Sequence, residues 1–361
     1  MYSGDTVGVK VLLTYFHSCD LIPLSIMPPN KVFSWDQYFP PKPLFTDRNI
    51  PSSLHGKVYV VTGANCGMGK ELARVLYSRN AKVYVACRSE AKGVQAIAEI
   101  KKAEPYSAGE LVFLNLDLAD LTKVRIAARE FQAQETKLHV LFNNAGVMVG
   151  PSDPPTKTAQ GYEEALGVNC VATFLFTKLL TPTLIATARS EPTDTVRVVW
   201  LSSFGLEAFA PEGRGIDMDN LDYHIPKPHI DRYGISKAAT WLLAVEYARR
   251  HNSDNIVSVA INPGNIRTEL ARHQGLALKL IAGAIVYPVI NGVYTQLFAA
   301  FSPELTIANF DWSKQWVIPF GRVASLRPDL PPATLPVEDG GNGNAQQFWE
   351  WNEQQVKDYL M

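Results

Sequence analysis

The sequence has almost no excess charge, few cysteines and no long unbroken hydrophobic run, and each shortage excludes a class of protein. It contains 34 Lys and Arg residues against 35 Asp and Glu, for a formal net charge of −1. A chain so balanced lacks the basic surface that binds nucleic acid or an acidic membrane. Its cysteines are widely spaced and form no CxxC pair: Cys19, Cys66, Cys87 and Cys170. We therefore expect a cytoplasmic protein with reduced thiols rather than a disulfide framework, and we predict no metal site.

The apolar runs are too interrupted to predict a membrane span. The N-terminal run "VKVLLTYFHSCDLIPLSIMPP" is broken by His17, Asp20 and Pro23, and it is also a poor signal sequence. The longest apolar stretch, residues 276–301, contains a lysine, a proline and two polar amides. It predicts two shorter helices, one of them a candidate lid, and contact with a membrane surface is the less favoured interpretation.

Short apolar segments recur along the chain, each separated from the next by a helical pattern. Hydrophobic residues make up 47% of the 361 positions, which is ample for a buried core. The strand-like segments are 57–62, 82–87, 110–116, 138–143, 196–202 and 256–262. Near-continuous apolar strands between helices are typical of a parallel sheet covered on both faces. The pattern predicts an α/β protein with a Rossmann-type doubly wound parallel sheet.

Composition divides the chain into a central domain and two extensions. Residues 1–55 are rich in proline and aromatics and predict an extended arm lying on the domain. Residues 56–322 hold the alternating pattern and predict one catalytic domain. The tail, residues 323–361, opens with prolines and glycines and ends in "AQQFWEWNEQQVKDYL", which predicts a helix whose aromatic residues dock on the core.

The stretch "TGANCGMG", Thr62 to Gly69, lies between the first predicted strand and the first helix. Its glycines, Gly63, Gly67 and Gly69, allow a sharp turn and close approach to a pyrophosphate, with Met68 in the same loop. The N-terminus of the following helix favours an anion. A plain tight turn is the alternative, but the strand–turn–helix context favours a dinucleotide site.

The second predicted strand ends in "ACRS", without the acidic residue that binds the ribose 2′-hydroxyl of NAD. Arg88 stands there instead, and a guanidinium suits a 2′-phosphate, so the pattern favours NADP(H). Otherwise Arg88 is a solvated loop cation. After the third strand, Asp117 is placed either to accept from an adenine amino group or to cap a helix. After the fourth, "NNAG" places Asn143 and Asn144 beside a cofactor or in an ordinary turn.

Tyr233 and Lys237, in "YGISK", are four residues apart, close to one helical turn. The following "AATWLLAVEYARR" keeps apolar residues at helical spacing, so both side chains would leave one face of a helix. Taken alone, the pair fits a surface helix equally well.

The ordered set "TGANCGMG", "NNAG", "SS", "YGISK" and "PGNIRT" resembles the short-chain dehydrogenase/reductase family, from about residue 57 to residue 270. The segment "VYVACRSEAKG" and the long gap before the tyrosine are similar to the retinol-dehydrogenase-like branch. The arm and the tail resemble filamentous-fungal members, many of which modify secondary metabolites.

The resemblance implies a role for each matching residue. Tyr233 would exchange a proton with the substrate oxygen, and Lys237 would lower its pKa and hold the nicotinamide ribose. Ser203 would orient the carbonyl, because the family usually uses the second serine of such a pair, with Ser202 as its structural neighbour. Asn169 would position a proton-relay water; without the resemblance it reads as a helix amide facing solvent.

The resemblance extends to the loop after the sixth strand, where the backbone of Ile266 and the hydroxyl of Thr268 would hold the carboxamide and a phosphate. The insert 204–231 separates the serines from the tyrosine by more than the usual family spacing. Long loops of this kind often form lids, so we expect 204–231 and 276–301 to border the substrate pocket.

Together these residues predict an NADP(H)-dependent oxidoreductase that interconverts a carbonyl and a secondary alcohol on an apolar small molecule. The alternative is a non-catalytic NADP-binding regulator or scaffold, but such relatives typically lose the tyrosine or the lysine that this chain keeps. An epimerase or dehydratase is disfavoured because the chain has no dedicated sugar-nucleotide domain. A homo-oligomer is compatible with the sequence.

Overall fold

The computed structural model describes residues 35–152, 154–267 and 286–360. Most of the predicted arm and part of the predicted lid segment therefore lie outside the described residues, as does Thr268. The described residues belong to one compact unit that begins at Ser34. Its mostly parallel sheet with helices on both faces confirms the predicted fold class.

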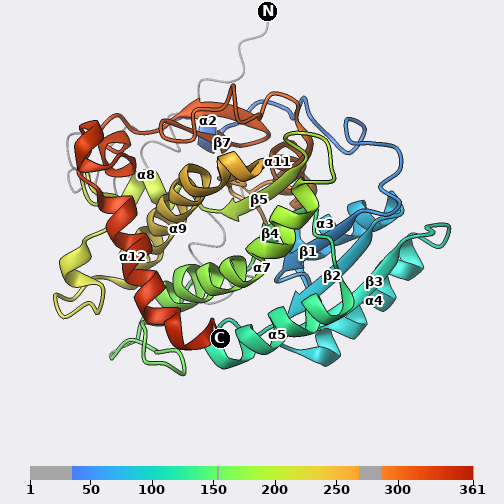
Figure 1. The fold of residues 1–361 in the computed structure, drawn as a ribbon, viewed down its shortest axis with the longest axis horizontal. Coiled ribbons are helices and arrows are strands. Elements are labelled where there is room, and N and C mark those ends of the chain that lie inside the picture. Colours follow the sequence, from blue (N-terminus) through green and yellow to red (C-terminus); the bar gives the residue numbers. More distant parts are fainter. Residues whose placement is uncertain (1–34, 153, 268–285, 361) are drawn as a thin grey trace, which may run out of the picture. The chain divides into compact units, whose positions relative to one another are not determined.

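Eight strands form a single sheet in the order β3-β2-β1-β4-β5-β6-β7-β8 (Figure 1). Neighbouring strands are parallel except for β7 and β8, which are antiparallel. The strands are β1 Val58–Thr62, β2 Lys82–Cys87, β3 Glu110–Asn115, β4 Val140–Asn143, β5 Val196–Leu201, β6 Ile256–Ile261, β7 Gln315–Ile318 and β8 Arg322–Ser325. The first six lie within the predicted segments, whereas the last two were not predicted and carry the sheet past residue 322.

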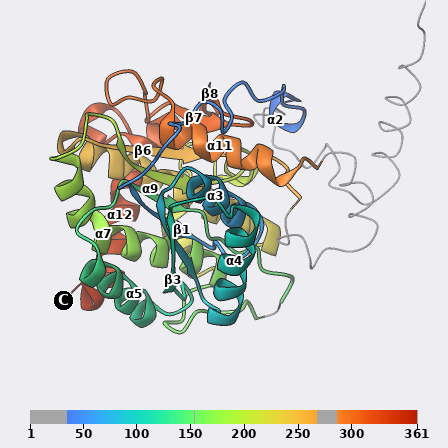
Figure 2. The same ribbon diagram turned by 90° about the vertical axis from the view of Figure 1, so that its right-hand side faces the viewer.

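The central strands are apolar on both sides, and in the described part of the chain three helices cover each face of the sheet. One face carries α5 (Leu121–Gln134), α7 (Thr173–Ala188) and α9 (His229–His251). The other carries α3 (Gly67–Ser78), α4 (Glu90–Ala103) and α11 (Val289–Phe301). Figure 2 shows α5 and α7 on one side of β1, with α3, α4 and α11 on the other. One of the two helices predicted in 276–301 is therefore α11, a packed helix of the core.

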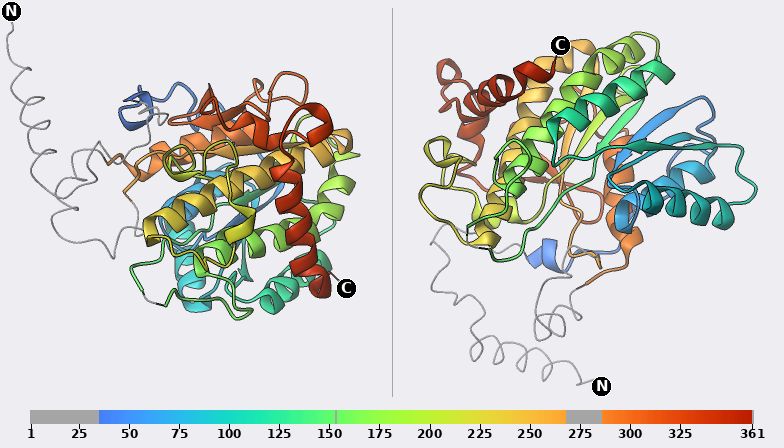
Figure 3. Two further views of the ribbon diagram at one scale, coloured as in Figure 1. Left: turned by 90° about the vertical axis from the view of Figure 1, so that its left-hand side faces the viewer. Right: turned by 90° about the horizontal axis from the view of Figure 1, so that it is seen from below.

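The C-terminal helix α12 (Asn344–Val356) lies along α9 and α7 (Figures 1 and 3). The rings of Trp349 and Phe174 meet edge to face, 4.7 Å apart. Lys178 of α7 pairs with Glu353 of α12. The aromatic tail helix thus docks on the core, as its sequence predicts.

Shorter elements complete the described chain. The short α-helices are α2 Trp35–Tyr38, α6 Glu164–Leu166 and α8 Gly205–Phe209. A π-helical turn, η2 Gly167–Ala172, joins α6 to α7. The 3₁₀ turns are η3 Met218–Asn220, η4 Asn252–Asp254, η6 Pro331–Thr334, η7 Val337–Asp339 and η8 Lys357–Tyr359.

The helical stretch Glu164–Ala188 is the one run among the described residues that is long and apolar enough to cross a membrane. In its most apolar window, 67% is buried inside the protein, where α7 contacts α5 and the sheet. A buried core helix of a globular protein can have the same length and composition. The burial of α7 against its neighbours is that of a core helix.

Candidate active site

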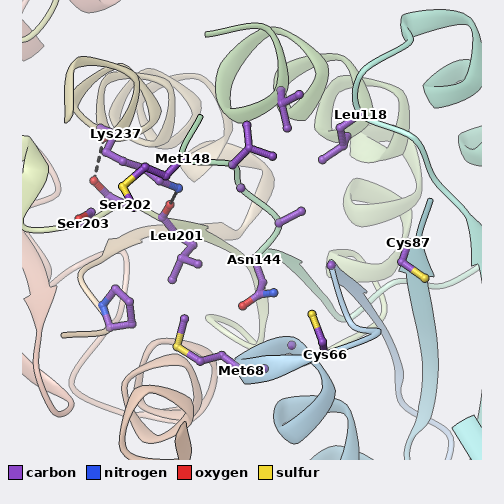
Figure 4. A pocket seen from close by; sticks show the side chains of 18 of the residues that line it. Cys66, Met68, Cys87, Leu118, Asn144, Met148, Leu201, Ser202, Ser203 and Lys237 are labelled. Carbon is purple, nitrogen blue, oxygen red and sulfur yellow. Dashed lines mark hydrogen bonds between the residues drawn. The ribbon is translucent and has the colours of Figure 1, made fainter. Parts of the chain in front are cut away.

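A cavity of about 530 Å³ opens at the carboxyl ends of the parallel strands (Figure 4). The sheet reverses its strand order between β1 and β4, which is where ligands bind in open α/β sheets. The predicted site residues that line the cavity are Gly63, Gly67, Met68, Gly69, Arg88, Asp117, Asn144, Ser203, Tyr233, Lys237 and Ile266. Residues predicted from motifs far apart in the sequence are therefore brought to one place.

The glycine-rich loop between β1 and α3 has a backbone that few other residues could adopt. Gly63 and Gly67 have φ angles of +69° and +54°. A Cβ added to Gly69 would lie 2.6 Å from the Asn144 amide nitrogen and 2.7 Å from the Gly63 carbonyl oxygen. The side chain of Cys66 makes no capping bond to α3, so it does not satisfy the N–H groups of the first turn. The loop thus has the close backbone approach and the helix N-terminus that bind a pyrophosphate.

The turn after β4 is fixed by hydrogen bonds across the strand crevice. The Asn144 amide donates to the Thr62 carbonyl (2.8 Å), and the Ala145 N–H donates to the Thr62 hydroxyl (2.8 Å). Gln296 of α11 donates to the Asn144 side-chain oxygen (3.0 Å) and is 1% exposed. Gln296 was read in the sequence only as an interruption of an apolar stretch. The signal that could have identified Gln296 is its position as an amide among apolar residues on the buried face of α11.

Arg88 and Asp117 line the part of the cavity beyond β2 and β3, away from the serines that follow β5. Arg88 directly follows β2 and is exposed. Asp117 accepts a hydrogen bond from the Ala119 N–H (3.1 Å) and pairs with Lys123 (3.2 Å). The cap of α5 is instead Asp120, whose carboxylate accepts from the N–H of the second residue of the helix. The helix-cap interpretation of Asp117 was therefore wrong.

The two serines after β5 have different partners (Figure 4). The hydroxyl of Ser202 donates to the backbone carbonyl of Lys237 (2.7 Å) and is buried. The Ser203 hydroxyl accepts from the Gly205 N–H (3.1 Å) and lies close enough to the Tyr233 side chain to lower its pKa. The hydroxyl of Ser203 thus faces the tyrosine, whereas that of Ser202 joins β5 to α9.

Tyr233 and Lys237 both lie near the start of α9, with the lysine nitrogen 5.8 Å from the centre of the tyrosine ring. The Lys237 ammonium donates to the Leu201 carbonyl (2.7 Å), and burial lowers its pKa to about 8. Burial raises the pKa of Tyr233, while the nearby Ser203 hydroxyl acts in the opposite direction. Desolvation is therefore the dominant effect on the pKa of this tyrosine, and the lowering by Lys237 that the family resemblance implies stays a prediction.

Asn169 lies in the π-helical turn η2, behind the cavity wall. Its side-chain oxygen accepts from the Val147 N–H (2.8 Å), and its amide donates to the Val147 carbonyl and to Ser236. It is 2% exposed, so the interpretation as a solvent-facing amide was wrong. A Cβ added to Gly146 would lie 2.9 Å from the Lys237 nitrogen, so the turn passes close to the lysine. Asn169 therefore joins the turn after β4 to α9.

A buried ion pair that the sequence did not reveal fixes the start of α9. Arg232, next to Tyr233, donates to the carboxylate of Glu163 (3.1 Å) and to the Lys227 carbonyl (2.7 Å). Burial raises the pKa of Glu163, and its hydrogen bonds and Arg232 act against that effect. Because its partners are distant in the sequence, this pair has no local signature.

Of the two segments predicted to border the substrate pocket, the insert 204–231 contributes to the cavity lining and the described part of 276–301 packs behind it. In the insert 204–231, Phe204 lines the cavity. In 276–301, α11 packs behind the lining: a Cβ on its Gly292 would lie 2.5 Å from the Met68 sulfur. Residues 268–285, which contain Thr268 and the rest of the lid segment, lie outside the described residues.

The chain is similar to several known proteins. Residues 57–204 match the family model described as "short chain dehydrogenase". A short-chain dehydrogenase/reductase of Phomopsis amygdali is 51% identical over 91% of this chain and 97% of its own. The short-chain dehydrogenase/reductase pkfC of Emericella nidulans is 44% identical over 88% and 98%.

A solved structure shows the same architecture. A putative uncharacterized protein from Mycobacterium paratuberculosis aligns with a TM-score of 0.58 at 26% identity, covering 87% of this chain and 97% of its own. The 3-ketoacyl-(acyl-carrier-protein) reductase of Brucella melitensis, with a TM-score of 0.54 at 21% identity over 70% and 93%, shares the fold.

Proposed function

Because this chain belongs to the short-chain dehydrogenase/reductase family, we propose that it is an NADP(H)-dependent oxidoreductase that interconverts a carbonyl and a secondary alcohol on an apolar small molecule. The family provides the oxidoreductase activity and the nicotinamide cofactor. The observation that carries the rest is the grouping of Ser203, Tyr233 and Lys237 in one cavity with a glycine-rich loop. We extend the proposal to fungal secondary metabolism, which the resemblance of the arm and the tail to filamentous-fungal members supports.

The cavity fits a dinucleotide. A side chain at Gly69 would fill the space beside Asn144 and Gly63, so these glycines keep room for a pyrophosphate against the start of α3. Arg88, exposed at the cavity and directly after β2, would hold a 2′-phosphate through paired N–H donors. No carboxylate follows β2 before Glu90, which supports NADP(H) over NAD(H).

The chemistry of the site depends on where its protons are. When bound, the nicotinamide supplies or accepts the hydride. Because burial raises the pKa of Tyr233, its hydroxyl carries a proton at neutral pH and is ready to donate it to a carbonyl oxygen. Ser203, which lies beside the same hydroxyl, would orient that oxygen and stabilise its developing negative charge. Lys237, with its pKa lowered to about 8, is positioned to carry positive charge beside both groups.

The substrate end of the cavity supports an apolar molecule. Figure 4 shows Leu201 and Met148 on the side of the cavity that holds the serines, with Met68 across from them. Phe204, the residue after Ser203, also lines the cavity. Apolar lining with a few convergent polar groups is typical of small-molecule sites. The hydroxyls of Ser203 and Tyr233 would select the oxygen of the substrate, and the surrounding carbon surface would select its body.

The test is a screen of carbonyl substrates by NADPH absorbance, with NADH in parallel, followed by Tyr233→Phe on the best substrate. The variant keeps the ring and removes the proton donor, so folding and nucleotide binding should persist. We expect the rate of hydride transfer to fall by about 10²–10⁴-fold. Equal rates in parent and variant, or nucleotide binding without turnover in the parent, would favour the non-catalytic regulator instead.

A further inference from the structure

A glutamine from the N-terminal arm contacts a residue that lines the cavity. Gln37 lies on α2 and is 5% exposed, and both ends of its amide are used. Its nitrogen donates to the carboxylate of Glu207 (2.9 Å), and its oxygen accepts from the side-chain amide of Asn262 (2.9 Å). A buried amide with both partners satisfied fixes the separation of the two groups that it joins.

One partner, Glu207, belongs to α8, the helix that follows Ser203. The Ser203 hydroxyl accepts from the first N–H of this helix, on Gly205 (3.1 Å). A Cβ added to Gly205 would lie 3.0 Å from the Cα of Gly234, the residue after Tyr233. The position of α8 therefore affects both Ser203 and Tyr233.

The other partner, Asn262, lines the cavity directly after β6. Its side-chain oxygen accepts from the Gly264 N–H (3.0 Å), in a turn where Gly264 has a φ of +86°. The same loop continues to Ile266, which also lines the cavity. Asn262 therefore shapes this wall of the cavity, and Gln37 joins that wall to α8.

Further contacts fasten α2 at the same place. The ring of Tyr38 meets the ring of Phe204 edge to face, 4.8 Å apart, and Phe204 lines the cavity. Arg322 of β8 donates to the Asp36 carbonyl (2.9 Å). Arg327 donates to the backbone carbonyl of Glu207 (2.6 Å). In the described part of the chain, the side-chain carboxylate of Glu207 accepts its hydrogen bond from Gln37.

We propose that Gln37 is a positioning residue for the reaction: through Glu207 and Asn262 it holds Ser203 and the loop after β6 at the separation that hydride transfer requires. The inference rests on the proposed function, and it assigns the N-terminal arm a part in turnover. A misplacement of about 1 Å is enough to cost about a hundredfold in rate, so a small shift of α8 would be measurable.

The pair allows an exchange that preserves every hydrogen bond. In Gln37→Glu, two buried carboxyl groups face each other; because burial already raises the pKa of Glu207 to about 7, they can stay in contact only by sharing a proton, and the amide donor is lost. In the double variant Gln37→Glu/Glu207→Gln, the carboxylate at position 37 accepts from Asn262 and from the new amide at position 207. The single variant Glu207→Gln keeps an acceptor for Gln37. The four proteins form a double-mutant cycle that isolates the contact.

We expect Gln37→Glu to lower kcat by about ten- to a hundredfold. Glu207→Gln should stay close to the parent, and the double variant should recover most of the lost kcat. Gln346→Glu is the matched control, because Gln346 donates to Glu350 at the same 2.9 Å on the exposed face of α12. If Gln37→Glu does not fold, Gln37→Met removes both bonds without adding charge and should show the same loss of kcat.

Hydrogen exchange of the backbone amides decides the inference independently of turnover. Amides of α8 and of Gly264 should exchange faster in Gln37→Glu and return to the parent rate in the double variant. Unchanged exchange and unchanged kcat in Gln37→Glu would overturn the proposal, and so would a double variant that regains thermal stability without kcat. A parent that transfers no hydride, or full activity in Tyr233→Phe, would refute the proposed function, and the exchange rates would still show whether Gln37 holds these walls.

Discussion

At the scale of the residue, the polar groups of the site divide into those that hold the backbone and those that face the cavity. Ser202 and Ser203 illustrate the division. The Ser202 hydroxyl donates to the backbone carbonyl of Lys237, whereas the Ser203 hydroxyl faces Tyr233. The sequence places both serines at the end of a strand, and the family pattern selects the second. Only the path of the chain after β5 shows which hydroxyl faces the tyrosine.

Arg88 carries the prediction of cofactor preference. Arg88→Asp replaces paired donors by a carboxylate that repels a 2′-phosphate and suits a ribose hydroxyl. We expect the dissociation constant for NADPH to rise by about ten- to a hundredfold and that for NADH to change little. Arg189→Asp, at the exposed end of α7, makes the same change of charge and should leave both constants unaltered. Nucleotide titration checks the prediction, and equal affinity of the parent for the two nucleotides would contradict it.

At the scale of the element, the strands that could be predicted are mainly those buried on both faces, because their sequences are then largely apolar. The first six strands are apolar along most of their length, so their composition identifies them. β7 and β8 have four residues each, and β8 is only partly buried. Their sequences "QWVI" and "RVAS" are too short to identify as strands, and it is pairing that makes them so: β7 pairs with β6 and, across the turn at Gly321, with β8.

At the amino ends of β1 and β4, away from the cavity, a charged cluster surrounds Glu191. His139, which precedes β4, accepts from the Val58 N–H of β1 (2.9 Å) and faces Glu191 (3.2 Å). Although burial by itself raises the pKa of Glu191, its hydrogen bonds with Lys57, Lys137 and His139 bring it down to about 2. Burial lowers the pKa of His139, so the ring is held neutral.

These pKa shifts predict the direction of acid destabilisation. Because the pKa of Glu191 is lower in the folded chain than its ordinary 4.5, its stabilisation is complete above pH 4.5 and is lost as the pH falls toward 2. Glu191→Gln should lower the free energy of unfolding by about 1–2 kcal/mol at neutral pH, with the difference shrinking below pH 4.5. Urea unfolding over this range measures it. A difference that is independent of pH, or one equally large in the exposed control Glu350→Gln, would contradict the prediction.

At the scale of the whole molecule, the parts that sequence reasoning missed are contacts between distant segments. The glycine loop and the tyrosine–lysine spacing are local, so a short stretch reveals each of them. The hydrogen bond from Gln37 to Glu207 joins residues 170 positions apart, and neither side chain lies in a recognisable motif. Gln296 and Arg232 likewise meet partners that only the folded chain brings close.

The docking of α12 predicts a large contribution to stability from one aromatic side chain. Trp349 is 3% exposed, packs on Phe174 and lies under the Arg250 guanidinium, 5.0 Å from its ring centre. Trp349→Ala should lower the free energy of unfolding by about 3–5 kcal/mol. Trp351→Ala, on the partly exposed side of the same helix, is the control and should cost clearly less. Denaturant unfolding of both variants checks this, and similar losses in the two variants would contradict the prediction that Trp349 makes the larger contribution.

The positions of Gln37 and α12 also bear on how the protein is made. Synthesis proceeds from the N-terminus, so Gln37 leaves the ribosome long before Glu207 and Asn262 exist to receive its amide. The helix that carries Tyr233 and Lys237 likewise gains its outer cover only after α12, which follows β7 and β8 in the chain, has been synthesised. It follows that the contact between α2, α8 and the loop after β6 can be completed only after Asn262 has left the ribosome.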